Sequence, residues 1–171
     1  MTISCGSGLI INKIIINGEN ITKDVKNKVI KGYLYIKRAW EPNTKIQLEF
    51  EMRTQILRSN LEVKDNLRKV ALKRGPIIYC FESLVSSENI NPDTIYVKTN
   101  EWITERLVNN DLGQYVEIET KAEQYNYLND SQDLYFEQKL QTKQISITLI
   151  PYFMWCNRGE SYLAVWLNEK F

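Results

Sequence analysis

Three consecutive residues, Arg74, Gly75 and Pro76, place a cation beside two backbone breakers inside the apolar run RKVALKRGPIIYCFES, residues 68–83. Proline has no N–H to donate to a strand and glycine weakens one, so these residues predict a corner, a bulge or an edge. An arginine beside a flexible glycine could bind an anion. The alternative is structural, because an arginine at a strand corner often pairs with a carboxylate, for which Glu82 is the obvious candidate. We favour the structural role.

The chain has three cysteines and no histidine. Cys5, Cys80 and Cys156 are far apart and form no C-x-x-C motif, so we expect free thiols that behave as small buried apolar residues. Without an imidazole, Ser-His-Asp triads, Cys-His pairs and H-E-x-x-H zinc sites cannot be built. Glycine-rich phosphate-binding motifs do not occur either. The sequence therefore predicts no metal site and no cofactor.

Charge and hydropathy exclude two classes of partner. Lys and Arg number 22 against 21 Asp and Glu, which gives no electrostatic reason to expect nucleic acid. No run of about 18 apolar residues could cross a membrane. The start, MTISCGSGLIINK, lacks the basic and apolar regions of a signal peptide, so we expect a cytoplasmic protein.

Most of the chain alternates between apolar and polar residues, the pattern of strands with one buried face. In TKIQLEFEMR, residues 44–53, every second residue from Ile46 to Met52 is apolar. The run GYLYIKRAW, residues 32–40, alternates in the same way, and we expect these two runs to form a hairpin through the turn residues EPNT. The pair Asn17-Gly18 after an isoleucine-rich run predicts another tight reversal.

Further alternating runs bring the expected total to about ten strands. They are TIYVKT (94–99), QYVEIET (114–120), DLYFEQKL (133–140), QISITLI (144–150) and SYLAVWL (161–167). The best candidate for a helix, NEWITERLVNN at residues 100–110, is short and fits a strand equally well.

These patterns predict an all-β fold, an antiparallel β-sandwich of one or two small packed modules with at most one short helix. We place the seam at the polar stretch SNLEVKDN, which divides the chain into modules at residues 1–66 and 67–171. The closing strand, residues 161–168, could return from the second module to the first.

Two segments resemble recurrent motifs of the glycoside hydrolase family 127 enzymes, the β-L-arabinofuranosidase type. Residues 70–82 match V-A-L-x-R-G-P-x-x-Y-x-x-E, and residues 150–166 match I-P-Y-x-x-W-x-N-R-G-x-x-x-x-x-V-W. INGENI and KGYLYIKRAWEPNTKIQLEFEMR also look like family segments, although Pro42-Asn43-Thr44 stands where the family tends to have Gly-Asp. The resemblance is collinear and covers nearly the whole chain.

The resemblance implies that the chain corresponds to the C-terminal β-sandwich region and lacks the catalytic (α/α)6 barrel, which carries the nucleophilic cysteine, the zinc ligands and the acid/base. Cys80 and Cys156 lie in β-module motifs, so no catalytic role transfers to them. The first module would be incomplete. A separately encoded barrel is then an expected partner, and an exposed strand edge is expected to promote homo-oligomers.

The motif residues are expected to hold the fold. They are Arg74, Gly75, Pro76, Tyr79, Glu82, Pro151, Tyr152, Trp155, Asn157, Arg158 and Trp166. For Arg158 we expect pairing with Glu160 or with backbone carbonyls. A hydrolytic pair of Glu82 and Glu160 is the weakest reading, because the sequence gives no sign that the two carboxylates face each other.

We therefore expect a non-catalytic fragment that acts as a structural, accessory or oligomerisation module. The alternative is a free-standing carbohydrate-binding module, in which exposed aromatic residues, among them Trp40, Tyr152 and Trp155, would contact the sugar. An independent enzyme is the third and weakest reading.

Overall fold

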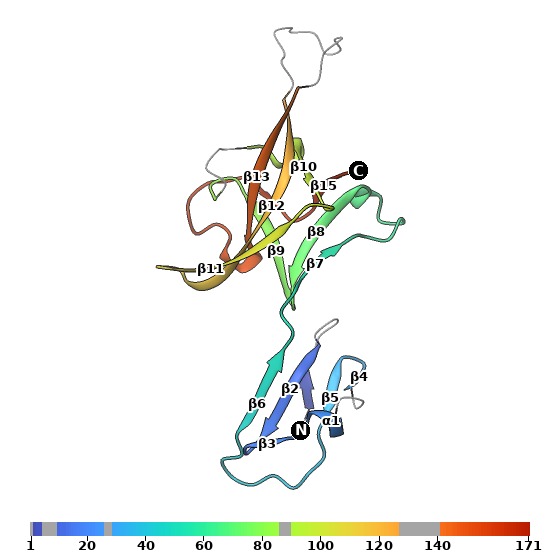
Figure 1. Ribbon diagram of the computed structural model, residues 1–171, viewed down its shortest axis with the longest axis vertical. Coiled ribbons are helices and arrows are strands. Elements are labelled where there is room, and N and C mark those ends of the chain that lie inside the picture. Colours follow the sequence, from blue (N-terminus) through green and yellow to red (C-terminus); the bar gives the residue numbers. More distant parts are fainter. Residues whose placement is uncertain (1, 5–9, 26–28, 86–89, 127–140) are drawn as a thin grey trace. The chain divides into compact units, whose positions relative to one another are not determined.

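The computed structural model describes residues 2–4, 10–25, 29–85, 90–126 and 141–171, which form two compact units (Figure 1). The N-terminal unit comprises residues 1–54 and 74–76, and the C-terminal unit comprises residues 55–73 and 77–171. The seam expected near residue 66 thus lies close to residue 54, because β7 (Thr54–Leu57) already pairs with β8 (Lys69–Arg74).

The described residues of the N-terminal unit form two three-stranded antiparallel sheets and one short helix, α1 (Thr22–Val25). The first sheet has the order β1 (Thr2–Ser4), β5 (Tyr33–Tyr35), β4 (Val29–Ile30). The second has the order β3 (Glu19–Asn20), β2 (Ile11–Ile16), β6 (Ile46–Phe50). The buried core of this unit consists of Ile14, Ile16, Ile21, Leu34 and Ile36.

One of the two predicted hairpins of this unit is confirmed and the other is wrong. Asn17 and Gly18 have φ angles of 49° and 88° and connect β2 to β3, as positive φ at both turn residues requires. β5 and β6, by contrast, belong to different sheets. EPNT does turn the chain, with a hydrogen bond from Thr44 N to Glu41 O of 3.3 Å, but local turn chemistry does not determine which strand is paired next.

The C-terminal unit is built on one large sheet that closes on itself. Its order is β14 (Leu163–Ala164), β9 (Ile77–Glu82), β13 (Gln141–Pro151), β12 (Gly113–Asn126), β10 (Ile95–Lys98), β15 (Leu167–Lys170), β8, β7. β9 and β8, which each lie next to an end of this order, also pair with each other and close a ring of six strands, with β14 and β7 outside it. β10 and β15 are parallel, whereas β12 is antiparallel to β10 and β13, β13 to β9, and β15 to β8. The predicted all-β, mainly antiparallel fold is confirmed.

The ring encloses the main core. Its largest fully buried side chains are Tyr79, Phe81, Leu72, Ile95, Ile118, Ile147, Leu149 and Leu167. They come from six strands because alternate residues of each strand point inward. A smaller apolar cluster, formed by Cys80, Tyr115, Ile150 and Met154, lies around the opposite faces of β9, β12 and β13.

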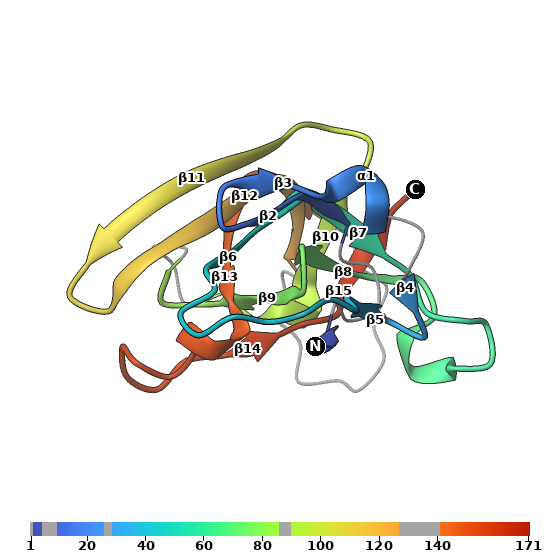
Figure 2. The ribbon, with the colours of Figure 1, turned by 90° about the horizontal axis from the view of Figure 1, so that it is seen from below.

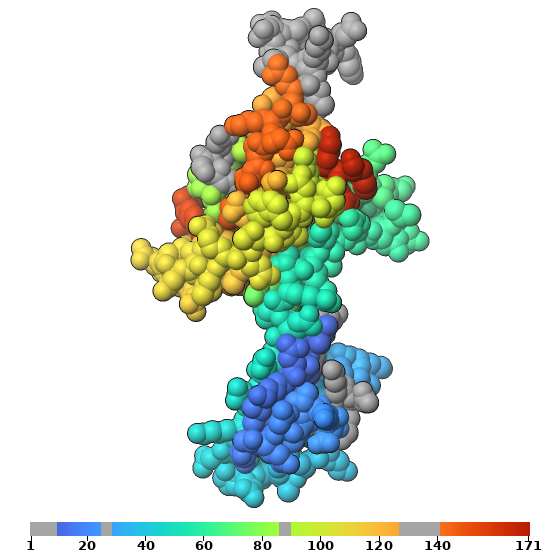
Figure 3. All heavy atoms as spheres, in the orientation of Figure 1, coloured from blue at the N-terminus to red at the C-terminus, as the bar shows by residue number. Residues whose placement is uncertain are grey.

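Two segments whose structure or pairing the sequence left open, residues 100–110 and 161–168, contain strands. β11 (Ile103–Asn110) takes the place of the candidate helix and pairs with β12, and the two form an arm that stands out from the rest of the unit (Figures 1 and 3). The expected closing strand divides into β14 and β15, and both pair within the C-terminal unit. The predicted strand DLYFEQKL lies outside the described residues.

Three single-turn 3-10 helices lie within the described residues. They are η1 (Lys64–Asn66), η2 (Pro92–Thr94) and η3 (Tyr152–Met154). η1 lies within the polar stretch SNLEVKDN. η3 follows β13 directly and begins the segment, orange-red in Figure 2, that leads to β14.

Candidate functional site

The most concentrated polar chemistry surrounds Glu82, the last residue of β9, whose side chain is completely buried. Its Oε1 accepts hydrogen bonds from Cys156 N at 3.2 Å and Ser161 Oγ at 3.0 Å. Its Oε2 accepts one from Arg158 Nη1 at 2.9 Å. A buried carboxylate is stable only when it is paired and hydrogen-bonded, and Glu82 meets that condition through the segment after η3.

The arginine that pairs with Glu82 differs from the predicted one. Arg74 ends β8 at the corner, whereas β9 carries the chain from Ile77 to Glu82, about 16 Å along an extended strand. Arg158, from a segment distant in sequence, forms the ion pair with Glu82 instead. Arg74 and Glu82 are close in sequence, but Arg74 lies at the β8–β9 corner and Glu82 lies at the far end of β9. Closeness in sequence therefore predicted the wrong arginine.

The Arg158 guanidinium donates hydrogen bonds to several groups. Its Nη1 also donates to Met154 O at 3.2 Å, so one of the partners predicted for it, a backbone carbonyl, is confirmed. The same carbonyl accepts a hydrogen bond from Asn157 Nδ2 at 3.0 Å. Adjacent residues of the N-R-G motif therefore fix the end of η3.

The network continues from Arg158 to the β11–β12 arm. Arg158 Nη2 donates to the buried Tyr115 hydroxyl at 3.0 Å, and that hydroxyl donates to Glu117 Oε1 at 3.2 Å. Glu117 Oε2 accepts from Arg106 Nη2 at 2.6 Å, and this bond raises the pKa of the Arg106 guanidinium. The sequence analysis did not identify Tyr115 or Glu117. The one indication in the sequence is that they are two residues apart, which places them on the same face of a strand.

The two described cysteines have different environments. Cys80 is buried, and burial together with the charge of Glu82 raises the pKa of its thiol to about 12, although Arg158 opposes the shift. A thiol with so high a pKa is a poor nucleophile near neutral pH. Cys156 is exposed, so the expectation of a buried thiol is confirmed for Cys80 and wrong for Cys156, while Cys5 lies outside the described residues.

Other motif residues lie close to the same strands. The Tyr79 hydroxyl donates to Val116 O at 2.9 Å, and Tyr79 pairs with Pro151 across β9 and β13. Trp166 is half-buried in the bend between β14 and β15.

Gly75 and Pro76 form the predicted corner in the N-terminal unit, where Gly75 N donates to Arg53 O at 3.4 Å.

The three aromatic residues predicted to contact a sugar do not come from one unit. Tyr152 and Trp155 are exposed side chains of the C-terminal unit, and their rings are stacked with centroids 6.3 Å apart. Trp40 belongs to the N-terminal unit, where the Arg38 guanidinium lies 5.9 Å from its ring centroid.

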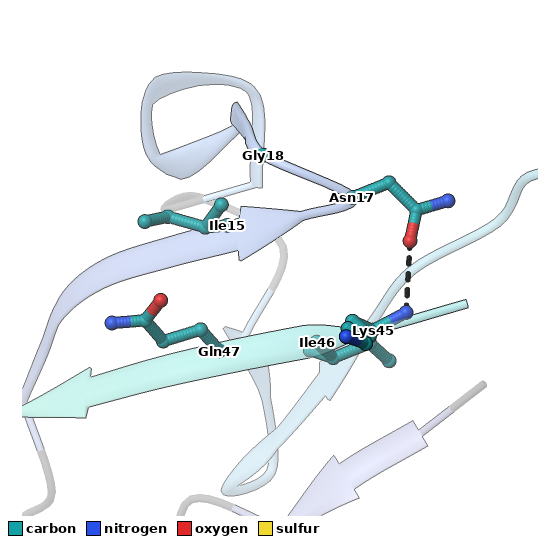
Figure 4. A pocket seen from close by; sticks show the side chains of 6 residues that line it. All are labelled: Ile15, Asn17, Gly18, Lys45, Ile46 and Gln47. Carbon is teal, nitrogen blue, oxygen red and sulfur yellow. Dashed lines mark hydrogen bonds between the residues drawn. The ribbon is translucent and has the colours of Figure 1, made fainter. Parts of the chain in front are cut away.

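The N-terminal unit has a shallow pocket without a buried polar network like the one around Glu82. It encloses about 620 Å³ between the β2–β3 turn and the start of β6, and its lining residues are Ile15, Asn17, Gly18, Lys45, Ile46 and Gln47 (Figure 4). Asn17 Oδ1 is already occupied by Lys45 N at 2.8 Å. No carboxylate, histidine or cysteine is among the lining residues.

Neither a group of metal-ligating side chains nor a membrane-spanning helix is found in the part of the chain that the structure describes. Within it, no three His, Cys, Asp or Glu side chains converge on a position where they could hold a metal ion. None of its helices is long and apolar enough to cross a membrane.

Comparison with known proteins identifies the family. The glycoside hydrolase family 127 C-terminal domain matches residues 54–168. The chain belongs to this family.

Solved family 127 structures extend the match beyond those residues. A GH127 β-L-arabinofuranosidase from Geobacillus stearothermophilus T6 is 32% identical, with a TM-score of 0.73 over 95% of this chain and 25% of the other. Another GH127 β-arabinofuranosidase is 28% identical, with a TM-score of 0.71 over 96% of this chain and 25% of the other.

A curated relative is much longer as well. The non-reducing end β-L-arabinofuranosidase of Bifidobacterium longum subsp. longum is 24% identical over 74% of this chain, which corresponds to 20% of that protein. This chain therefore spans only a fifth to a quarter of the length of the family 127 relatives that it matches.

Proposed function

We propose that this chain is a non-catalytic β module of a family 127 type hydrolase and acts as a structural or accessory partner of a catalytic domain. The observation that carries the proposal is the extent of the match, which covers nearly all of this chain but only a quarter of the solved enzymes. A separately encoded catalytic barrel is the expected partner. We retain the cytoplasmic location as a prediction.

The environment of Glu82 supports a role without catalysis. A general acid or base must reach a proton on the substrate. Both oxygens of Glu82 are buried and occupied by donors of the same chain, whereas Glu160 is an exposed residue. Glycoside hydrolysis by two carboxylates requires both to flank one bond, and this environment makes Glu82 a poor candidate for such a pair.

An activity assay tests the proposal. The purified 171-residue chain is incubated with p-nitrophenyl β-L-arabinofuranoside, with the full-length Geobacillus enzyme as positive control. We expect no release of nitrophenol above the buffer blank. Hydrolysis by the chain that is lost in Glu82→Gln would overturn the proposal.

A carbohydrate-binding module is the second candidate, and the exposed stacked rings of Tyr152 and Trp155 favour it. Calorimetry with L-arabinofuranosides separates the two functions. Millimolar or tighter binding that Trp155→Ala abolishes would support the binding module, whereas the accessory role predicts no heat of binding.

A further inference from the structure

Residues 152–162, which we call the strap, connect β13 to β14 (Figure 2). Beyond η3 the strap has no strand or helix, since residues 155–162 form only turns, bends and irregular chain. Met154 of η3 packs into the smaller apolar cluster together with Cys80 of β9 and Ile150 of β13. The strap therefore packs against the outer face of the ring, whereas the main core lies inside the ring.

Side-chain hydrogen bonds hold the middle of the strap. One end follows directly from η3, and at the other end Ser83 N donates to Tyr162 O at 3.0 Å. Between them, Cys156 has a φ of 65°, in the left-handed region that most residues other than glycine avoid. Such a conformation persists only where surrounding contacts maintain it. The contact here is the hydrogen bond of 3.2 Å from Cys156 N to the buried Glu82 carboxylate.

Arg158 connects the middle of the strap to two strands. Its guanidinium donates to Glu82 Oε2 at the end of β9 and, at 3.0 Å, to the Tyr115 hydroxyl on β12. A phenol has one proton to donate, and Tyr115 donates it to Glu117 Oε1 at 3.2 Å, which leaves its lone pairs for Arg158. Glu117 in turn accepts from Arg106 of β11 at 2.6 Å. A continuous series of hydrogen bonds thus runs from the strap to the β11–β12 arm.

Arg106, at the outer end of this series, keeps the buried acceptor in place. A buried carboxylate is stable only when it is paired and hydrogen-bonded. Without Arg106, Glu117 would retain one phenolic donor, which favours movement of its carboxylate toward solvent. That movement would remove the acceptor that orients the Tyr115 hydroxyl, and Arg158 would lose a well-directed partner.

We infer that the strap opens as a unit while the ring stays folded, and that the β11–β12 arm holds it closed through the series from Arg106 to Arg158. The strand pairing and the main core of the ring do not include the strap. Segments with few ladder hydrogen bonds and a small apolar contact open at a lower free-energy cost than the whole molecule. A ligand or partner that displaces β11 would therefore raise the fraction of molecules with an open strap.

Cys80 reports the opening, because its thiol is buried in the cluster to which the strap contributes Met154. In the full chain with Cys5→Ser and Cys156→Ser, Cys80 is the only thiol. Its reaction with an aromatic disulfide at pH 8, followed by the absorbance of the released thiolate, measures the open fraction in the native protein.

Tyr115→Phe and Arg106→Gln in this background should each accelerate the reaction at least about tenfold, because each removes a hydrogen bond to a charged group. Urea below the unfolding transition should change these rates little, since opening of the strap exposes little surface. Arg58→Gln is the matched control. Like Arg106, Arg58 is a largely exposed arginine that pairs with a buried glutamate, in this case Glu169. It should leave the labelling rate in native conditions unchanged, because this ion pair has no bond to the strap.

Three outcomes would overturn the inference. Labelling of every variant that depends on urea as steeply as global unfolding does would show that the strap does not open separately. Faster labelling of Tyr115→Phe but not of Arg106→Gln would remove the arm from the device. Acceleration by Arg58→Gln as large as by Arg106→Gln would show general destabilisation instead.

Discussion

At the scale of single residues, Glu82 organises the segment that closes the C-terminal unit. Its carboxylate joins β9 to residues 156, 158 and 161 by three hydrogen bonds. Removal of one partner from a buried ion pair leaves the other charge without compensation, at a cost of about 3–5 kcal/mol. The position is therefore one where a small substitution should affect a whole loop.

Glu82→Ala is expected to lower the free energy of unfolding by about 3 kcal/mol or more, because Arg158 would lose its carboxylate in a largely buried site. Glu160→Ala, at an exposed position two residues after Arg158, should change it by less than about 0.5 kcal/mol. Urea titrations at neutral pH measure both values. Equal effects of the two substitutions would show that the Glu82 network contributes little.

Thiol reactivity distinguishes the two described cysteines. In a Cys5→Ser background, Cys156 should react with a disulfide reagent at pH 8 in the native protein, because its side chain is exposed. Cys80 should react only after unfolding, because burial protects it and raises its pKa to about 12. Mass spectrometry of the labelled peptides locates the modified thiol. Rapid native labelling of Cys80 would contradict the buried environment.

At the scale of elements, the corner between β8 and β9 depends on backbone conformation. Gly75 has a φ of 57°, a value that costs most L-residues about 1–2 kcal/mol. A Cβ at this position would also clash with Met52 Sδ, near the flexible end of that side chain. The corner thus explains why a glycine follows Arg74.

Gly75→Ala should lower the free energy of unfolding by about 1–2 kcal/mol, owing to the positive φ. Gly75→Asn is the matched variant, and it should cost less than Gly75→Ala because asparagine tolerates the left-handed region better. Urea denaturation ranks the two. If alanine proves as stable as glycine, positive φ is not what selects this residue.

A group of ion pairs links β10, β12 and β15 on the outer face of the ring. Glu123 accepts hydrogen bonds from Gln144, Lys170 and Lys98, in that order of influence, and these lower its pKa to about 2. Because the pKa in the folded state lies below that of the unfolded chain, the interaction stabilises the fold above about pH 4.5. This contribution disappears as the pH falls towards 2.

Glu123→Gln should therefore be less stable than the wild type at pH 6, and the difference should shrink as the pH falls through the folded-state pKa of about 2, because Glu123 then becomes protonated and is uncharged like glutamine. Glu62→Gln, at an exposed position, should follow the wild type throughout. Thermal unfolding across this pH range provides the measurement. A difference that stays the same between pH 6 and pH 2 would point to packing rather than charge.

At the scale of the whole molecule, the N-terminal unit has exposed strand edges. β4 pairs with β5 alone among the described strands, and its two residues, Val29 and Ile30, are exposed. Such edges favour pairing with other chains unless charges block them. The self-association expected from the sequence stays a prediction.

We expect the isolated chain to form concentration-dependent oligomers, and Ile30→Lys to weaken them by placing a charge on the edge strand. Leu61→Lys is the control, because it adds the same charge to an exposed apolar position away from this edge. Light scattering over a range of concentrations measures the effect. A strict monomer at the highest concentration would contradict the prediction.

The sequence by itself determined the elements with strong local patterns. Alternation identified β6, β10, β12 and β13, and Asn17-Gly18 identified the β2–β3 turn. These features depend on side-chain period and on the φ angles of a few residues, and both can be read from neighbouring positions. The family followed from motifs that together extend over most of the chain.

The tertiary structure alone decided which distant strands and side chains meet. Neither the closure of the ring by the β8–β9 pairing nor the separation of β5 from β6 into different sheets follows from local alternation. The partnership of Glu82 with Arg158 joins residues 76 positions apart. A carboxylate pairs with whichever cation the fold brings to it, and that choice depends on long-range packing, which a local pattern does not contain.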